Sequence, residues 1–190
     1  MASITGQTDL DLEMLLLGGF RFTVTAGPTL RRDKWHGGLF VQYVTSDEGD
    51  FVVERSGGSK VAGVVLFPSE RYDPLIGGTF GPMYGSNDNW TSYQPGTGVG
   101  GQNGVSIISG GLIGFFKLYE TIALSGGTRS GGPIVYHLHD KLRVSENGLL
   151  CNDSAAQLIL AGVTDPLEVG IVSAVPSTRN KNRLGADIKY

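Results

Sequence analysis

The stretch "LFVQYVTSDEGDFVVE", residues 39–54, decides the fold class because it joins two strand-forming segments through a turn. Residues 39–45 and 50–54 are rich in Val, Phe and Tyr, which fit the pleated surface of a sheet. The connecting "TSDEGD", residues 45–50, supplies the Ser, Asp and Gly that tight turns use. The sequence therefore predicts a β-hairpin at this point.

Segments of the same kind recur at short intervals along the rest of the chain, with turn residues between them. This spacing is typical of a sandwich or a barrel. We predict a mainly β fold, a small β-barrel or sandwich of short antiparallel strands. The expected strands are 20–26, 39–45, 50–54, 60–67, 105–109, 115–124, 133–139, 141–145, 157–163, 169–175 and 186–190.

The length of 190 residues suits one domain, and we expect a single β domain over residues 20–190. Residues 1–19 are expected to form an N-terminal arm or a short helix. Thr8 and Asp11 stand at capping-box spacing before "LEMLLL", but the leucines fit a helix face only loosely. A docked arm and a helix over 9–17 therefore remain equal alternatives.

Residues 77–104 interrupt the strand pattern with nine glycines, two prolines and four aromatic residues. A connection of this length without secondary structure usually serves a function or a contact. Aromatic side chains are enriched at protein interfaces, which favours a contact role over an ordinary surface excursion. We interpret 77–104 as a loop insertion rich in Gly and aromatic residues.

The composition excludes several classes of function. A net charge of −3 and a pI near 5.6 provide no broad basic field for nucleic acid. Residues 105–116, the most apolar region, are shorter than the ~20 residues that span a bilayer, so no membrane-spanning segment is expected. Acidic residues precede the apolar run near the N-terminus, where a signal peptide would carry positive charge, so no signal peptide is expected. Cys151 is the only cysteine, so we expect no intrachain disulfide and assembly in a reducing cytoplasm.

The segment "HLHD", residues 137–140, is the one arrangement that suggests a metal site. On a strand, His137 and His139 would point to the same side and could reach one ion. A catalytic site needs a third ligand, and the remaining histidine, His36, is about a hundred residues away in the sequence. We therefore predict no metal, no cofactor and no enzymatic activity.

Two basic stretches allow two interpretations each. Arg179, Lys181 and Arg183 form either a solvated hairpin between the last two strands or a contact for phosphate or an acidic partner, and the hairpin is favoured. The stretch "LRRDKWHGG", residues 30–38, suits a polar interface as well as a turn whose tryptophan folds inward.

Several stretches of the sequence carry a resemblance to a known family. "HDKLRVSENGLL", residues 139–150, has the pattern of a strand, a Glu-Asn-Gly turn and a return strand. The other stretches are "VGIVSAVPSTRNKNRLGADIKY", residues 169–190, and two that come earlier in the chain. In these features the sequence resembles the capsid decoration, or cement, proteins of tailed bacteriophages. The matching stretches are 23–41, 61–70, 139–150 and 169–190.

The resemblance implies a mainly β virion protein that binds the outer surface of an assembled capsid and stabilises it against internal DNA pressure. Its expected partner is the phage major capsid protein, and its expected state is a homotrimer. It implies no catalysis, and it covers neither residues 1–19 nor 77–104. No nucleic acid, membrane or small-molecule substrate is expected as a partner.

Other functions remain as alternatives, namely another phage structural component, such as a head-fibre or tail protein, or a carbohydrate-binding β module. A metal-dependent β-barrel enzyme built on the two histidines ranks last. For a capsid or intersubunit contact, the arm and the long loop offer the best anchors, since extended segments can span neighbouring subunits. The candidate contact residues are Leu15, Leu16, Leu17, Tyr84, Trp90 and Tyr93.

Overall fold

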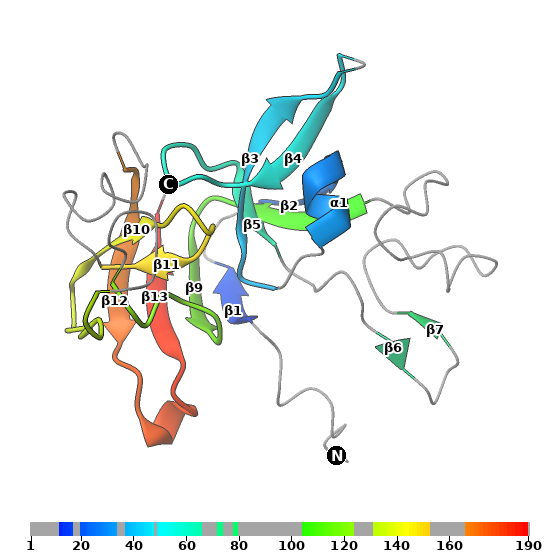
Figure 1. The fold of residues 1–190 in the computed structure, drawn as a ribbon. Coiled ribbons are helices and arrows are strands. Elements are labelled where there is room, and N and C mark those ends of the chain that lie inside the picture. The colour runs from blue at the N-terminus through cyan, green and yellow to red at the C-terminus, as the bar shows by residue number, and fades with distance from the viewer. Residues whose placement is uncertain are drawn as a thin grey trace.

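The computed structural model describes residues 12–16, 20–33, 37–47, 49–65, 72–73, 78–79, 104–123, 131–152 and 166–189. Over these residues the protein is mainly β, as predicted (Figure 1). One antiparallel sheet has six strands, a second has five, and a short pair joins β6 (Tyr72–Asp73) to β7 (Gly78–Thr79).

The six-stranded sheet combines strands from the two ends of the described chain. Its order is β1 (Leu12–Leu16), β9 (Leu112–Phe116), β13 (Leu184–Ile188), β12 (Glu168–Ala174), β10 (Lys141–Val144) and β11 (Leu150–Cys151). Gly170 on β12 approaches β13 so closely that a Cβ atom would overlap the carbonyl oxygen of Asp187. Glycine is therefore needed at this crossing of the two strands.

The five-stranded sheet curls until its two edge strands meet. Its order is β2 (Phe20–Thr25), β8 (Gly104–Ser109), β5 (Gly63–Val65), β3 (Phe40–Thr45) and β4 (Phe51–Arg55). Ala26, directly after β2, forms a bridge with Val53 on β4, and the Gly27 N–H donates to the Val53 carbonyl at 2.8 Å. The sheet thus closes into a small barrel around its own apolar side chains.

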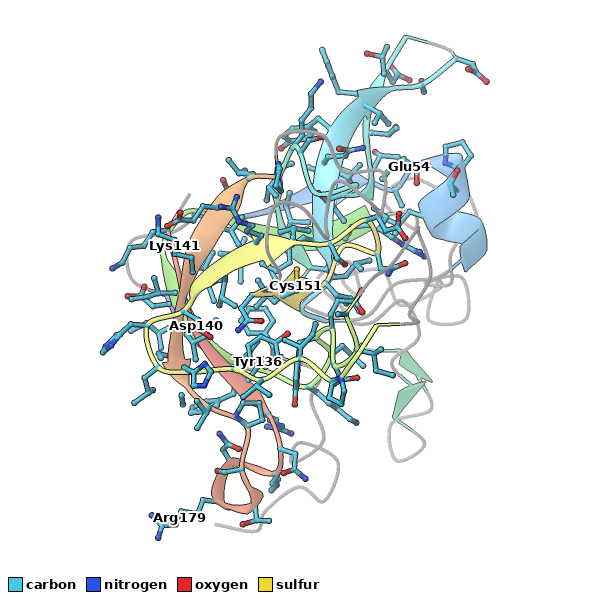
Figure 2. All side chains as sticks on the ribbon, turned by 60° about the vertical axis from the view of Figure 1, so that its left-hand side comes forward. Glu54, Tyr136, Asp140, Lys141, Cys151 and Arg179 are labelled. Carbon is cyan, nitrogen blue, oxygen red and sulfur yellow. The ribbon has the colours of Figure 1, made fainter. Side chains whose placement is uncertain are left out.

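A short helix, α1 (Pro28–Asp33), follows the barrel bridge and was not predicted from the sequence. Pro28 occupies the first helical position, where its missing N–H costs nothing. The Glu54 carboxylate on β4 accepts hydrogen bonds from the N–H groups of Thr29 at 2.9 Å and Leu30 at 2.6 Å (Figure 2). The cap comes from a residue far away in sequence, so local pattern could not reveal this helix.

β1 and β2 follow one another in the chain but belong to different sheets, and so do β8 and β9. β1 pairs with β9 in one sheet, and β2 pairs with β8 in the other. Gly110 and Gly111 connect β8 to β9, and Gly110 has a φ of 97°, which favours glycine. The Gly110–Gly111 connection therefore links the five-stranded sheet to the six-stranded sheet.

Two apolar cores result from this arrangement. One lies between the sheets and combines side chains of the barrel with those of the six-stranded sheet. The other fills the barrel, where Leu30 of α1 is buried with seven more residues. The barrel core is Ala26, Leu30, Leu39, Val41, Val53, Val65, Val105 and Ile107.

Several sequence predictions need correction. Residues 12–16 form a strand, so the helix over 9–17 is wrong there, and the β body begins before residue 20. Of the strand predicted at 115–124, only residues 115–116 belong to β9, and of the described part of the predicted 60–67 only 63–65 form β5. Residues 134–139 are not a strand, since Pro133 makes one isolated bridge and a turn follows. The predicted strand 157–163 lies outside the described residues.

Candidate functional site

The six predicted contact residues fall mostly outside the part that the structure describes. Leu15 and Leu16 lie in β1, where their backbones pair with Ile113 and Leu112 of β9. Leu17, Tyr84, Trp90 and Tyr93 lie outside the described residues. These four residues therefore stay predictions, and the candidate site described below consists of side chains that the structure places.

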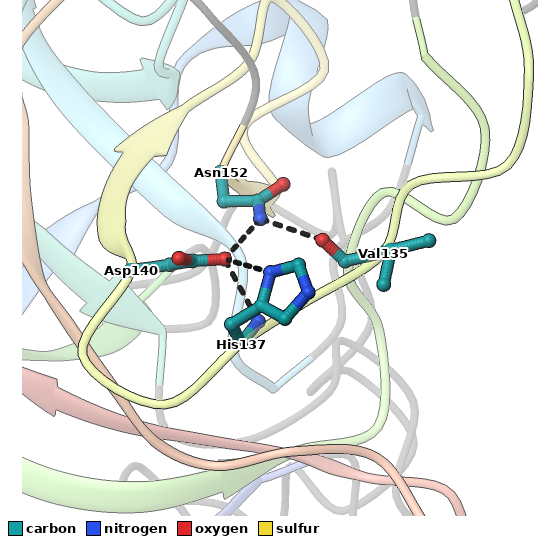
Figure 3. Close-up of polar contacts among 4 residues, drawn as sticks. All are labelled: Val135, His137, Asp140 and Asn152. Carbon is teal, nitrogen blue, oxygen red and sulfur yellow. Dashed lines mark hydrogen bonds and ion pairs between the residues drawn. The ribbon is translucent and has the colours of Figure 1, made fainter.

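The His-Leu-His-Asp segment adopts a turn instead of a strand. His139 has a φ of 68°, in the left-handed region, and its N–H donates to the Val172 carbonyl of β12 at 2.9 Å. The prediction that His137 and His139 point to the same side of a strand is therefore wrong. The reason is the turn at 138–139, which lets Asp140 fold back on His137 (Figure 3).

Asp140 is the centre of the hydrogen bonds that hold this turn. Its Oδ2 atom accepts from the His137 N–H at 2.8 Å and from the Asn152 side chain at 2.6 Å (Figure 3). Burial raises the pKa of Asp140, but these hydrogen bonds and the nearby His137 ring lower it, and the pKa lies below its ordinary value. Among the described residues, no group of three His, Cys, Asp or Glu side chains is arranged for a metal.

A groove beside this turn is a stronger candidate for a binding site. We call it the Tyr119 groove, a hollow of about 340 Å³ in which Tyr119 and Tyr136 meet edge to face, with ring centroids 5.5 Å apart. The groove is lined by Tyr119, Thr121, Ile134, Val135, Tyr136, Val175 and Pro176. Three segments that are distant in sequence thus build one largely apolar surface.

Buried polar contacts fix the floor of the Tyr119 groove. The Tyr136 hydroxyl donates to the Glu120 carbonyl, and the Glu120 N–H donates to the Leu150 carbonyl of β11 at 2.8 Å. The buried Glu120 carboxylate accepts from the Ser145 hydroxyl and the Asn147 side chain, both at 2.8 Å. The groove and the β10–β11 turn are therefore one connected unit.

Apolar side chains at the groove are open to solvent. Val135 is 65% exposed, and Ile122 and Val175 are each more than a third exposed. Val135 and Val175 line the groove, and Ile122 makes the bridge to Pro133 at its border. Such a concentration of exposed apolar groups on one surface is typical of a protein contact site.

Basic residues lie on the β12–β13 hairpin, which borders this groove. The β12–β13 connection contains η3 (Thr178–Asn180) and forms the predicted hairpin, but Arg183 in it is buried and not solvated as predicted. The Tyr119 hydroxyl donates to the Asn182 carbonyl at 2.9 Å, which joins the hairpin to the groove. Arg179 and Lys181 are exposed, and Arg179 points away from the body in Figure 2. We call the groove and this hairpin together the basic end.

The opposite end of the molecule carries acidic side chains. The β3–β4 hairpin projects from the barrel (Figure 1) and turns through Gly49, whose φ is 88°. The Ser46 N–H donates to the Asp50 carbonyl at 2.8 Å, and the Asp50 N–H donates to the Ser46 hydroxyl. Asp47 and Asp50 are exposed, and Phe51 is 77% exposed. We call Asp47, Asp50 and Phe51 the acidic tip.

Sequence reasoning missed the acidic tip although a signal was present. In the hairpin register Phe51 pairs with Thr45, and Val53 pairs with Tyr43. Phe51 and Val53 lie on the same face of β4, but Val53 is buried in the barrel core while Phe51, nearer the hairpin turn, is exposed, as is Tyr43 on β3. A phenylalanine directly after an acidic turn was therefore a recognisable sign of an exposed contact.

Comparisons with known proteins give the chain no relatives. No family model, curated protein or solved structure matches it. In the described part of the chain, no helix has the length and apolar character to cross a membrane.

Proposed function

We propose that the protein is a structural virion protein that binds the outer surface of an assembled phage capsid and stabilises it. In this role it acts as a homotrimer, its partner is the major capsid protein, and it performs no catalysis and carries no cofactor. The sequence resemblance to capsid decoration proteins supports this identity, and the mainly β architecture agrees with it.

One observation carries the more general part of the proposal, namely that the protein binds other proteins. Large apolar side chains are exposed at both ends of the β body, Phe51 at one end and Val135 at the other. Charged residues accompany each of them, Asp50 at the first end and Arg179 at the second. An apolar centre with a charged rim is the common composition of protein–protein interfaces.

The anchors for the capsid remain those proposed from the sequence, in residues 1–19 and 77–104. The fold changes how they should be tested, because residues 12–16 are an edge strand of the six-stranded sheet. Deleting 1–17 would remove β1 and disturb folding. Deleting 1–11 keeps β1, and Trp90→Ala and Tyr84→Ala remove the aromatic anchors of the loop.

The experiment is co-sedimentation with expanded empty capsids of the phage from which the gene comes, followed by particle imaging. We expect saturable binding and added density on the outer surface. Capsids already saturated with unlabelled protein should take up no labelled protein, which controls for non-specific adsorption. Each anchor substitution should lower occupancy at fixed concentration, since an aromatic hot spot contributes more than about 1–2 kcal/mol. Absence of binding by the intact protein would refute the proposal.

A further inference from the structure

The two ends of the molecule carry exposed side chains of opposite charge. The acidic tip presents an exposed aromatic side chain, Phe51, next to the carboxylates of Asp47 and Asp50. The basic end presents the Tyr119 groove, and Arg179 and Lys181 are exposed on the hairpin that contributes Val175 and Pro176 to the groove. One surface therefore presents an exposed aromatic ring with negative charges, and the other presents a groove with positive charges.

The separation of charge between the ends is clear in the described segments. The basic end includes residues 117–123, 131–140 and 175–183, and its two acidic residues are Glu120, which is buried, and Asp140, which accepts hydrogen bonds from His137 and Asn152. In the hairpin residues 45–47 and 49–52, by contrast, the charged residues are all acidic. Neither Asp47 nor Asp50 forms an ion pair with another described residue, and the same holds for Arg179.

We propose that the acidic tip of one copy docks on the basic end of a second copy, with the Phe51 ring seated in the Tyr119 groove. The groove, at about 340 Å³, has the size of sites that hold small apolar groups. In the groove the ring would meet Val135 and the Tyr119–Tyr136 pair. Asp47 and Asp50 would then face Arg179 and Lys181 across the rim.

The charges select a second copy as the occupant. Rim charges of opposite sign guide two surfaces into register and exclude partners of like sign. Two acidic tips, or two basic ends, would repel each other, so the contact must join unlike ends of two copies. This inference does not depend on capsid binding, since it concerns the protein in solution.

A contact between unlike ends has a consequence for assembly. Figure 1 places the β3–β4 hairpin and the β12–β13 hairpin at opposite ends of the body. Each copy that uses one end leaves its other end available for a further copy. Such contacts form a closed ring when the rotation between copies closes, and an open chain when it does not.

The test measures the mass of the purified full chain by sedimentation velocity over a wide range of concentration and salt. The wild-type protein should associate, and rising salt should weaken the association because the rim pairs are screened. Asp47→Lys/Asp50→Lys should abolish association, and Arg179→Glu/Lys181→Glu should do the same. Each of these variants has two ends of like charge.

Mixing the two charge-reversed variants gives the decisive measurement. Asp47→Lys/Asp50→Lys has a positively charged tip, and Arg179→Glu/Lys181→Glu has negative charges on the hairpin that borders the Tyr119 groove. The tip of the first variant should dock on the groove of the second, so the mixture should associate while each variant alone does not. Lys60→Glu is the control for charge reversal elsewhere, because Lys60 is exposed and lies outside both ends. The control variant should associate like the wild type.

Phe51→Ser tests the apolar anchor separately. We expect its association to weaken at least tenfold, with the circular dichroism spectrum unchanged because Phe51 is exposed. A wild-type protein that is monomeric at every concentration would overturn the inference. So would association that survives both charge reversals, or a mixture that stays monomeric. Loss of capsid binding alone, with association intact, would instead count against the proposed function.

Discussion

The rings of Phe40 and Phe116 stack with their centroids 6.1 Å apart and their planes inclined by 16°. Phe40 lies on β3 of the barrel and Phe116 ends β9 of the six-stranded sheet, and both side chains are fully buried. This pair belongs to the core between the sheets, which includes Val64 and Ile108 from the barrel and Leu184 from the six-stranded sheet. The two sheets therefore share one core.

Replacing Phe116 with alanine should destabilise both sheets together. Loss of a fully buried phenylalanine costs about 3–5 kcal/mol, through lost burial and the cavity that remains. We expect a single urea unfolding transition, shifted to lower denaturant, by both far-ultraviolet circular dichroism and tryptophan fluorescence. Phe115→Ala is the matched control, since the neighbouring Phe115 is 36% exposed and should cost below about 1 kcal/mol. Two separate transitions in the Phe116 variant would contradict the shared core.

Glu54 should stabilise helix α1 from outside the helix. Glu54→Ala removes both acceptors for the N–H groups of Thr29 and Leu30, and we expect a loss of about 1–2 kcal/mol, as for other helix caps. Glu54→Gln keeps one acceptor oxygen and should lose less. Gln42 lies opposite Glu54 in the β3–β4 register, so Gln42→Ala serves as the control. Equal losses for Gln42→Ala and Glu54→Ala would show that the cap contributes nothing.

Asp140 should show a pKa below that of an aspartate in an unfolded peptide. Because the pKa is depressed in the folded state, the stabilisation is present above the ordinary pKa and is lost as the pH falls through the lower folded value. Asn152→Ala removes one hydrogen-bond donor and should raise the pKa of Asp140 toward its ordinary value. Carbon-13 NMR titration of the carboxyl group measures both values.

Val135→Ala is the control for this titration. The Val135 carbonyl, which accepts from Asn152 at 2.9 Å, is unchanged by that substitution, so the pKa of Asp140 should stay as in the wild type. An Asp140 pKa that is equal in the wild type and in Asn152→Ala would refute the role of Asn152.

His139 should be replaceable by glycine but not by valine. Its φ of 68° is costly for a β-branched residue, so His139→Val should lose about 1–2 kcal/mol. His139→Gly should stay within about 1 kcal/mol of the wild type, because glycine adopts this conformation without steric cost. Urea unfolding of the three proteins compares them directly. Equal stability of the valine and glycine variants would show that residue 139 does not adopt the left-handed backbone conformation.

Metal should be unnecessary for folding and for binding. His137 and His139 sit in a turn with Asp140 hydrogen-bonded to His137 N–H, and that arrangement serves the turn itself. We expect protein purified without chelator to contain no stoichiometric metal, and its melting temperature to be the same with and without a chelator. Stoichiometric zinc, iron or nickel that disappears in a His137→Ala/His139→Ala variant would contradict this prediction.

Much of the fold could be predicted from local pattern because its signals are local. The β3–β4 hairpin and the Glu-Asn-Gly turn after β10 each combine strand residues with turn residues at the right spacing. In the second case Gly148 has a φ of 70°, so the turn chemistry was read correctly.

The remaining features depend on contacts between distant residues. Helix α1 needs Glu54, which follows it by more than twenty positions, and "PIVYHLH" alternates like a strand yet has no partner strand after Pro133. The Tyr119 groove joins three separate segments, so no single stretch of sequence announces it. The predicted aromatic anchors of the long loop stay predictions, since they lie outside the described residues.

The pairing of β1 and β2 with β9 and β8 also determines when the protein can fold during its synthesis. The ribosome makes β1 and β2 early, but their partner strands follow only about ninety residues later. β13, between β9 and β12, is the last of the described strands along the chain, so the six-stranded sheet is incomplete until translation has passed Ile188. Pairings of such long range fold slowly. The nascent chain must therefore keep β1 and β2 unpaired until β8 and β9 have been made. The six-stranded sheet is completed only after β13 has left the ribosome.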